Sequence, residues 1–312
     1  MAAVTLIEAA KAAFNNGEYH KAGIIKTFAE KTDLLRVLPF ENIQGNAMKY
    51  TREAATGSAA FRGVNQAYTP SNGNLENQTE SLMICGGELD VDKYIVKTMG
   101  EQVRTKHEML KVAGLAQNIG HKCIKGSVVT SNLEFDGLQV RCTDSQLLAN
   151  SSAADGAVLS LAKLDELIDK VDGPTHLLMS KAMRRTITAA SRTSTVGGFV
   201  TWTKDEFGRQ LAMYGDLPIL IADNNDDVNA SLAFDESFAG GGTAVGTSIY
   251  CLSIGEGKLQ GIQSGPLEVT DLGEIDASPV FRTRVEWYVS LVLAHPRAAA
   301  RLYSIKAGAA AA

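Results

Sequence analysis

The sequence lacks the signatures of membrane and secreted proteins. No apolar run in its 312 residues approaches the roughly 18 residues that a membrane-spanning helix needs. The N-terminus has no basic region followed by an apolar core, so we expect no signal peptide and no membrane partner. The four cysteines are widely spaced and form no CxxC pair, which indicates reduced, buried thiols of a cytosolic assembly: Cys85, Cys123, Cys142 and Cys251.

An excess of basic residues is also missing. The chain has 30 Lys and Arg against 35 Asp and Glu, a net charge of -5. A protein that coats nucleic acid needs clustered cations to displace counterions. The first 36 residues instead interleave cations with carboxylates, which argues against intimate nucleic-acid binding.

Catalytic and metal-binding patterns are absent as well. There is no phosphate-binding GxxxxGK[ST] motif and no dinucleotide fingerprint, and the five histidines are scattered. His121 and Cys123 alternate within one segment, so their side chains are not expected to face each other. Asp223, Asp226 and Asp227 lack the ligand spacing of a calcium loop. We therefore expect no catalytic, cofactor or metal site. An α/β enzyme of unknown activity ranks third among the functions that we consider for this chain, after the two that are described below.

The longest helical pattern runs from Asp90 to Lys122, with a helix expected over residues 90–119. Asp90 is a candidate N-cap and Gly120 a candidate C-terminal stop. A narrow apolar stripe at helical spacing predicts one packed face and one exposed face: Val91, Ile95, Met99, Val103, Leu110 and Ala113. An ordinary core helix of a compact α/β domain is the alternative reading.

Residues 41–80 show almost no helical pattern. Turn residues at Asn42–Asn46 and Pro70–Asn74 flank two weak strand candidates, Ala47–Arg52 and Ala60–Val64. Strands that are polar on both faces fold poorly alone. We expect a long hairpin supported by a partner subunit, and a disordered surface loop is the alternative.

The segments around the hairpin and the long helix complete the pattern. The N-terminal 37 residues have few apolar anchors, so they are expected to lie along a surface or on a neighbouring chain. Strand and helix patterns alternate across 157–254, which predicts a mixed α/β layer. Residues 279–295 form one strand pattern, longer than usual.

The order of these elements resembles the major capsid proteins of tailed bacteriophages, the HK ninety-seven-type fold that encapsulin shells share. The run from Leu38-Pro39-Phe40 to Ala60-Phe61-Arg62-Gly63-Val64 resembles the extended hairpin, or E-loop, of that family. Asp90–Lys122 resembles its spine helix. Tyr214–Leu220 is similar to a strand entry of its axial domain, and Arg282–Arg297 to its closing strand.

The resemblance implies an α+β fold with an N-terminal arm, an E-loop, a peripheral (P) domain with a long spine helix, and an α/β axial (A) domain. The implied boundaries are 1–37 for the arm, 38–84 for the E-loop, 85–150 with 270–298 for the P-domain, and 151–269 with 299–312 for the A-domain.

The same resemblance implies a structural protein of the virion and no enzyme. Hexamers and pentamers of the chain would form an icosahedral head around double-stranded DNA, assembled in the bacterial host cytoplasm. The implied partners are other copies of the chain, packaged DNA, a separate scaffolding protein, a portal and a decoration or cement protein. No large cleaved pro-segment is expected. An encapsulin-type nanocompartment that encloses an enzyme is the alternative.

Charged residues of the hairpin are the candidate intersubunit contacts: Lys49, Arg52, Glu53 and Arg62. Some relatives join a hairpin lysine to an asparagine of a neighbour beside a buried glutamate. Lys49 and Glu286 could stand for two of these groups, but no asparagine occurs after Asn229. Asp276 occupies the segment ahead of Glu286, and its carboxylate is a poor electrophile. We therefore expect no covalent cross-link, with Glu286 paired across the sheet to Arg282 or Arg284.

Overall fold

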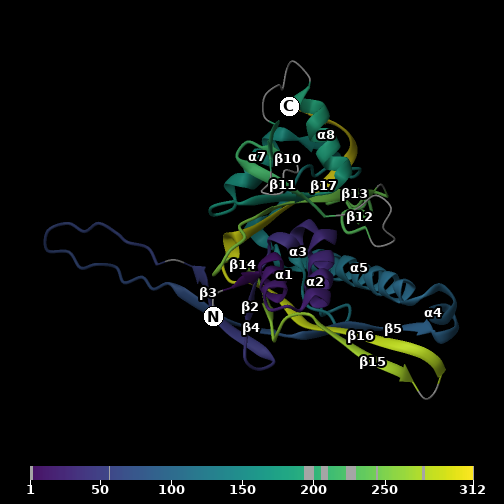
Figure 1. Cartoon of the computed structure of the whole chain (residues 1–312). Coiled ribbons are helices and arrows are strands. Elements are labelled where there is room, and N and C mark those ends of the chain that lie inside the picture. Colours follow the sequence, from purple (N-terminus) through teal and green to yellow (C-terminus); the bar gives the residue numbers. More distant parts are fainter. Residues whose placement is uncertain are drawn as a thin grey trace.

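The protein stacks two β-sheets with helices between and above them, and a long hairpin projects from one side (Figure 1). The structure is a computed structural model, and it describes residues 3–55, 57–192, 200–204, 210–222, 230–243, 245–275 and 278–311. The acidic turn around Asp223, Asp226 and Asp227, and Asp276 ahead of the closing strand, lie outside these ranges. No helix within them is long and apolar enough to cross a membrane.

The first sheet is built around one strand, β16. This strand spans 16 residues, Ser278–Leu293, and confirms the long strand expected near the C-terminus. It pairs antiparallel with β5, β14 and β15, and a parallel contact adds β2 beyond β14. The other strands of this sheet are β1 (Val4–Thr5), β2 (Pro39–Asn42), β5 (Met83–Asp92), β14 (Leu259–Gln263) and β15 (Glu268–Ile275).

Three N-terminal helices cover this sheet: α1 (Leu6–Asn15), α2 (Tyr19–Lys31) and α3 (Asp33–Val37). A capping box between Thr5 and Glu8 starts α1. The ring of Phe28 on α2 meets Trp287 of β16 edge-on at 5.3 Å. The expectation that this stretch has too few anchors to pack on its own chain is therefore wrong. Its apolar residues, among them Ile25, Leu34 and Leu35, belong to the core cluster that also holds Trp287.

The helix predicted over residues 90–119 is displaced and divided. Residues 90–92 belong to β5, where Val91 pairs with Phe281 of β16. The first helix, α4 (Lys93–Met99), starts after Asp92, whose side chain accepts from the Tyr94 amide at 2.7 Å. Gly100, with φ 86°, then breaks the helix, because that left-handed backbone suits glycine. The long helix α5 runs Glu101–Lys125.

The C-terminal stop and the packed face of this helix also differ from the prediction. Gly120 lies inside α5, where a Cβ would sit 2.7 Å from the Thr32 methyl carbon, and Gly126 ends the helix. Met99 and Leu110 of the predicted stripe are 70% and 69% exposed. The stripe that packs is rotated around the helix, with these buried members: Glu108, Val112, Leu115, Ala116, Ile119, Gly120, Cys123 and Ile124.

After α5, the short helix α6 (Leu138–Arg141) and a 3₁₀ turn at Asp144–Gln146 lead into a second sheet. The strand order there is β6-β17-β13-β8-β11-β10-β9, with β7 on β17 and β12 on β13. Its strands are β6 (Leu147–Ala149), β7 (Ala157–Ser160), β8 (His176–Met179), β9 (Val200–Lys204), β10 (Gln210–Tyr214), β11 (Leu217–Ile221), β12 (Glu236–Ser237), β13 (Val245–Leu252) and β17 (Ala299–Ala311).

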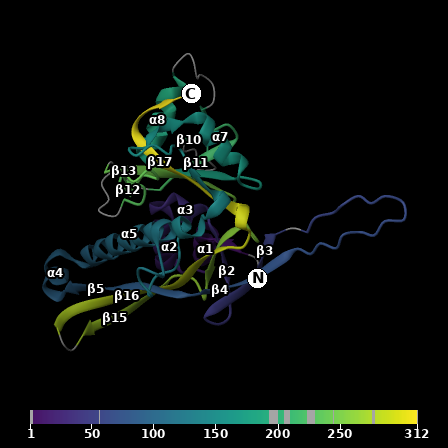
Figure 2. The same ribbon diagram turned by 180° about the vertical axis from the view of Figure 1, so that it is seen from behind.

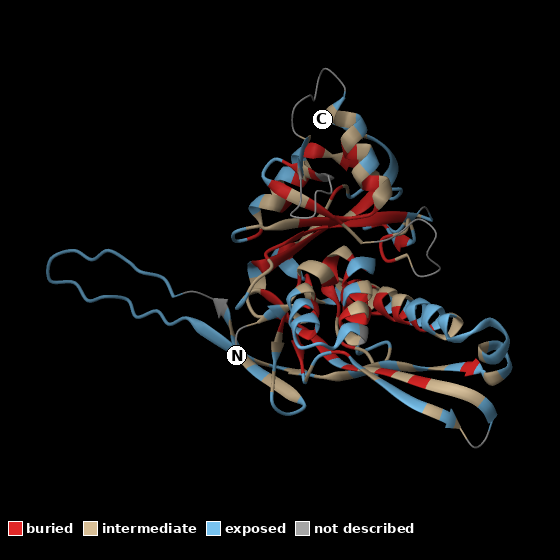
Figure 3. Ribbon diagram, viewed as in Figure 1, coloured by how far each residue is buried: buried red, intermediate tan, exposed pale blue. Residues whose placement is uncertain are grey.

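Two helices, α7 (Leu161–Asp169) and α8 (Lys181–Ser191), pack on the far face of the second sheet. Successive side chains of a strand point to opposite faces. Leu177 and Met179 of β8 accordingly join the core beneath α7 and α8, whereas Leu178 between them joins the core shared with α5. The view from behind shows the same layers, and burial follows them (Figures 2 and 3).

Strand β14 crosses the expected domain division. Residues 259–263 lie within the segment assigned to the A-domain, but they pair with β2 and β16 of the first sheet. The strand returns because Leu259 and Ile262 are fully buried there.

Candidate assembly interface

The projecting hairpin consists of β3 (Ala47–Ala55) and β4 (Asn74–Ser81), which pair only with each other. The register runs from Ala47 opposite Ser81 to Ala55 opposite Asn74. Nearly all of β4 and the loop beyond it are exposed (Figure 3). An isolated two-stranded hairpin is marginally stable in water. The hairpin thus has the form of an element that needs support from another molecule.

The loop at the end of the hairpin, residues 57–73, holds three large apolar side chains in solvent. Phe61, Val64 and Tyr68 are 108%, 92% and 67% exposed. The loop is ordered by its own contacts, since the Arg62 guanidinium lies 4.9 Å from the centre of the Tyr68 ring and donates to the Gln66 carbonyl at 3.2 Å. Single exposed apolar residues are common, but three on one projecting loop make it a candidate contact surface.

A partly buried ion pair fixes the foot of the hairpin to the body. Both arms of Arg141 on α6 donate to the Glu80 carboxylate of β4, at 2.6 and 2.8 Å. The Tyr50 hydroxyl donates to the Leu293 carbonyl at 3.3 Å and also contacts Glu80. Burial, followed by the charge of Glu80, raises the pKa of Tyr50, so it stays a neutral donor. Burial alone would lower the pKa of Arg141, but its bonds to Glu80 raise it.

The four charged residues predicted for intersubunit contact lie along the hairpin and do not form one cluster. Lys49 and Glu53 share the outward face of β3, because side chains two and four residues apart in a strand point the same way. Arg52 faces the other way and pairs with Glu76 of β4 at 3.2 Å. Arg62 lies at the far loop, where its contacts are local. Their role between subunits stays a prediction.

Sequence reasoning missed the residues that hold the hairpin in place. Glu80 and Arg141 are separated by 61 positions, and nothing in either segment marks them as a pair. For the apolar loop a signal was present: Phe61 and Val64 stand in a segment with no apolar partners of its own.

The exposed face of β5 and β16 carries a ladder of ion pairs. Arg282 pairs with Asp90 at 2.6 Å, and Arg284 with Glu88 at 2.9 Å. Through its hydrogen bond, Arg282 lowers the pKa of Asp90. Glu286 contacts Arg284 at 3.8 Å, so the expected partner is confirmed, although it lies on the same strand and not across the sheet.

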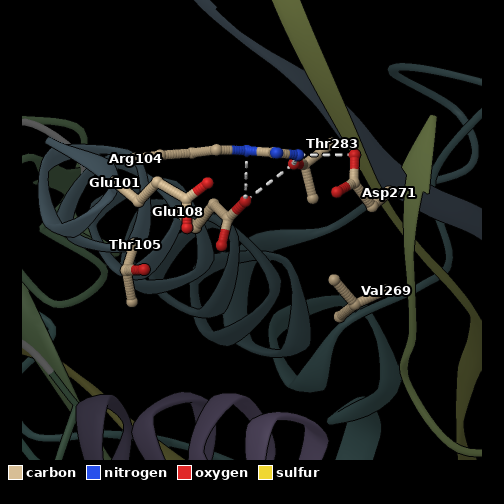
Figure 4. A pocket seen from close by; sticks show the side chains of 7 residues that line it. All are labelled: Glu101, Arg104, Thr105, Glu108, Val269, Asp271 and Thr283. Carbon is tan, nitrogen blue, oxygen red and sulfur yellow. Dashed lines mark hydrogen bonds and ion pairs between the residues drawn. The ribbon is translucent and has the colours of Figure 1, made fainter. Parts of the chain in front are cut away.

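A polar pocket lies between α5 and the β15–β16 hairpin (Figure 4). Within it, the Thr283 hydroxyl donates to Glu108 at 2.7 Å, and Arg104 lies 3.3 Å from the same carboxylate. Arg104 also pairs with Asp271, and this bond raises its pKa. Arg104 is the one cation among the lining residues, which also include the carboxylates of Glu101, Glu108 and Asp271. Its contacts with Glu108 of α5 and Asp271 of β15 brace the helix against the sheet.

Catalytic chemistry finds no support among the described residues. They contain no group of three or more His, Cys, Asp or Glu placed to hold a metal ion. Burial raises the pKa of Cys85 to about 11 and that of Cys123 to about 12. These thiols are protonated at neutral pH and poor nucleophiles.

Comparison with known proteins places the fold. No protein-family profile and no curated protein sequence matches the chain. A holo-SrpI encapsulin from Synechococcus elongatus PCC 7942 superposes with a TM-score of 0.63 at 15% identity, covering 89% of each chain. The capsid of a native GTA particle gives 0.63 at 13% identity, covering 90% of this chain and 91% of the other. A chain of Mycobacterium phage Adephagia gives 0.58 at 12% identity, covering 92% and 90%.

These likenesses cover 89–92% of this chain. At sequence identities of 12–15%, the comparisons show the architecture of the chain but not its activity. The α+β arrangement of a projecting hairpin, a spine helix on a long-stranded sheet and a second α/β layer is the HK ninety-seven-type fold of phage major capsid proteins.

Proposed function

We propose that this chain is the subunit of a closed protein shell and acts without catalysis. The observation that carries the proposal is the hairpin: it projects from the body, is held by a partly buried ion pair at its foot, and ends in a loop with three exposed apolar side chains. Such an element is stabilised by another molecule, and the fold's relatives include capsid chains.

The shell we favour is a phage head. In it, hexamers and pentamers of this chain enclose double-stranded DNA in an icosahedral virion, assembled in the cytoplasm of a bacterial host. A separate scaffolding protein, a portal and a decoration protein would complete the particle. Lys49, Arg52, Glu53 and Arg62 contact neighbouring copies. The net charge of -5 is compatible with DNA that is packaged by a motor, because such a shell does not need a basic inner surface to bind the DNA.

A second candidate is an encapsulin-type compartment with a protein cargo. The likeness to the Synechococcus elongatus encapsulin is as good, at a TM-score of 0.63, as the likeness to the GTA capsid.

The domains follow from strand pairing. We propose a P-domain that unites the first sheet with α1–α5, including residues 259–263, and an A-domain built on the second sheet with α7 and α8. The hairpin between Ala47 and Ser81 is the E-loop.

The test is assembly of the full chain and of one shortened variant. In the variant an Asn-Gly turn replaces residues 56–73, joining the paired residues Ala55 and Asn74. Wild-type protein should form closed particles by negative-stain microscopy, and the variant should remain a folded, soluble subunit. Nuclease-protected DNA in particles from native host cells supports the phage head, whereas a protein cargo supports the compartment. A wild-type chain that stays monomeric would refute both.

A further inference from the structure

Every charged residue of α8 and its C-cap Arg192 is basic. Lys181, Arg184, Arg185 and Arg192 are partly or fully exposed, and Met183 and Ile187 are buried. At about 100° per residue, the four cations fall within roughly 100° of the helix circumference, and their centre lies about 130° from that of the buried pair. We call these four residues the basic face.

The basic face is unfavourable within one subunit. Helix α8 contains no acidic residue, and no carboxylate of the described residues forms an ion pair with these cations. Lys181 stands at the positive N-terminal end of the helix dipole, and Lys181 and Arg185 repel each other one turn apart. These cations are therefore available for a partner outside the subunit.

Helix α7 shows the opposite arrangement. Asp165 and Asp169 are exposed one turn apart, while Leu161, Leu164 and Leu167 are buried. Asp169 is the last residue of α7, at the negative end of the dipole, and Lys170 follows it as the C-cap.

A neighbouring turn extends this negative surface. The Tyr214 hydroxyl donates to Asp165 at 2.8 Å, which brings the β10–β11 turn and its exposed Asp216 towards α7. We call Asp165, Asp169 and Asp216 the acidic face. Lys163 is neutralised by Glu166 at 2.7 Å on the other side of the helix.

The two faces are placed to meet between copies. Helices α7 and α8 lie on opposite sides of the upper domain in both views (Figures 1 and 2). They share one face of the sheet, so the basic face of one copy and the acidic face of the next can meet side by side. A contact between two different surfaces repeats head to tail, and it closes into a ring where the rotation permits.

We propose that the basic face of α8 docks on the acidic face beside α7 of the next copy of this chain, and that this charge contact sets the order of subunits within a ring. The inference rests on the proposed shell function and supplies a residue-level interface for it. It involves neither the hairpin nor nucleic acid.

The experiment reverses each charge and then both together. Arg185→Glu and Asp169→Lys alter exposed side chains whose removal breaks no ion pair among the described residues. Each should raise the subunit concentration for half-assembly about tenfold, measured by light scattering and sedimentation velocity. The double variant Arg185→Glu/Asp169→Lys restores opposite charges at every contact, so it should assemble within about threefold of wild type. Lys11→Glu, an exposed charge reversal on α1, should leave assembly unchanged.

The possible results of this experiment distinguish failure of the proposed interface from failure of the proposed shell function. Wild-type shells together with unaffected Arg185→Glu and Asp169→Lys variants would overturn this interface and leave the shell function standing. Failure of the double variant to recover would also overturn it, because a charge contact must be restored by the swap. Loss of co-purifying nucleic acid in Arg185→Glu without a change in assembly would assign the basic face to nucleic acid instead. A wild-type chain that never associates would overturn the shell function and this inference together.

Discussion

Arg141 and Glu80 join the foot of the hairpin to the body through two charge-assisted hydrogen bonds of 2.6 and 2.8 Å. Their side chains are only 10% and 18% exposed, so little solvent screens the pair. The Tyr50 hydroxyl adds a bond to the Leu293 carbonyl, and β4 continues after one residue into β5 of the first sheet. A subunit that must reach a neighbour at a fixed angle needs such a support.

Breaking this pair should loosen the hairpin. Arg141→Ala leaves the Glu80 carboxylate desolvated without its cation, so we expect a loss of about 2–4 kcal/mol in the free energy of unfolding. Hydrogen exchange should quicken in β3 and β4 before it changes in the sheets. The swap Glu80→Arg/Arg141→Glu should regain part of the loss. Lys163→Ala, which breaks an exposed pair, should cost less than about 1 kcal/mol. Equal losses in Arg141→Ala and Lys163→Ala would contradict this reading.

Phe61 should matter for assembly and not for folding. Its side chain is 108% exposed, so Phe61→Ser removes no intramolecular packing and should leave the melting temperature unchanged. If the ring is buried against a neighbour, about 2–3 kcal/mol is lost at each contact, and particle yield should fall steeply. Ala59→Ser, in the same exposed loop, is the control. Normal particle yield from Phe61→Ser would exclude the ring from the interface.

The sequence predicted correctly those elements whose local residue pattern agrees with the packing and strand pairing found in the structure. Helix α8 lies within residues 157–254, where alternating strand and helix patterns were predicted, and its buried residues Met183 and Ile187 recur at helical spacing after the Ser180 cap. The alternating pattern of β16 likewise matches its pairing on both sides. Both signals are local, so they can be read along the chain.

The break at Gly100 could not be predicted because a glycine inside a helix costs only about 1 kcal/mol. What decides the break is the pairing of residues 90–92 with a strand nearly two hundred positions away. The packed face of α5 was missed for a similar reason. Glu108 is buried because Thr283 and Arg104 satisfy its carboxylate, and that arrangement exists only in the folded chain.

His176 should make the protein sensitive to mild acid. Burial, and then the charge of Arg36, lower the pKa of His176 from 6.5 to about 4. The unfolded chain therefore binds the proton more readily, so this contribution to stability is complete above pH 6.5 and is lost as the pH falls towards 4.

The pH effect can be measured by urea unfolding at pH 7, 6 and 5. The total loss attributable to His176 is at most about 3 kcal/mol. His176→Asn should flatten the profile between pH 6.5 and 5, a range in which few carboxylates titrate. An equal slope in wild type and variant would show that His176 is not the group responsible.

Two glycines of α5 should respond to alanine in opposite directions. At Gly120 a Cβ would lie 2.7 Å from the methyl carbon and 3.0 Å from the hydroxyl of Thr32, which itself donates to the Ala116 carbonyl. Gly120→Ala should therefore push α2 from α5 and cost about 1–3 kcal/mol, more than the helix propensity it gains. At Gly114 nothing lies within 4 Å of the added atom, so Gly114→Ala should stabilise by up to about 1 kcal/mol. Thermal unfolding measures the stability of the two variants. The double variant Thr32→Ala/Gly120→Ala serves as a control, because it removes the close contact with the Thr32 side chain. If Gly120→Ala were as stabilising as Gly114→Ala, the close packing of α2 on α5 would be wrong.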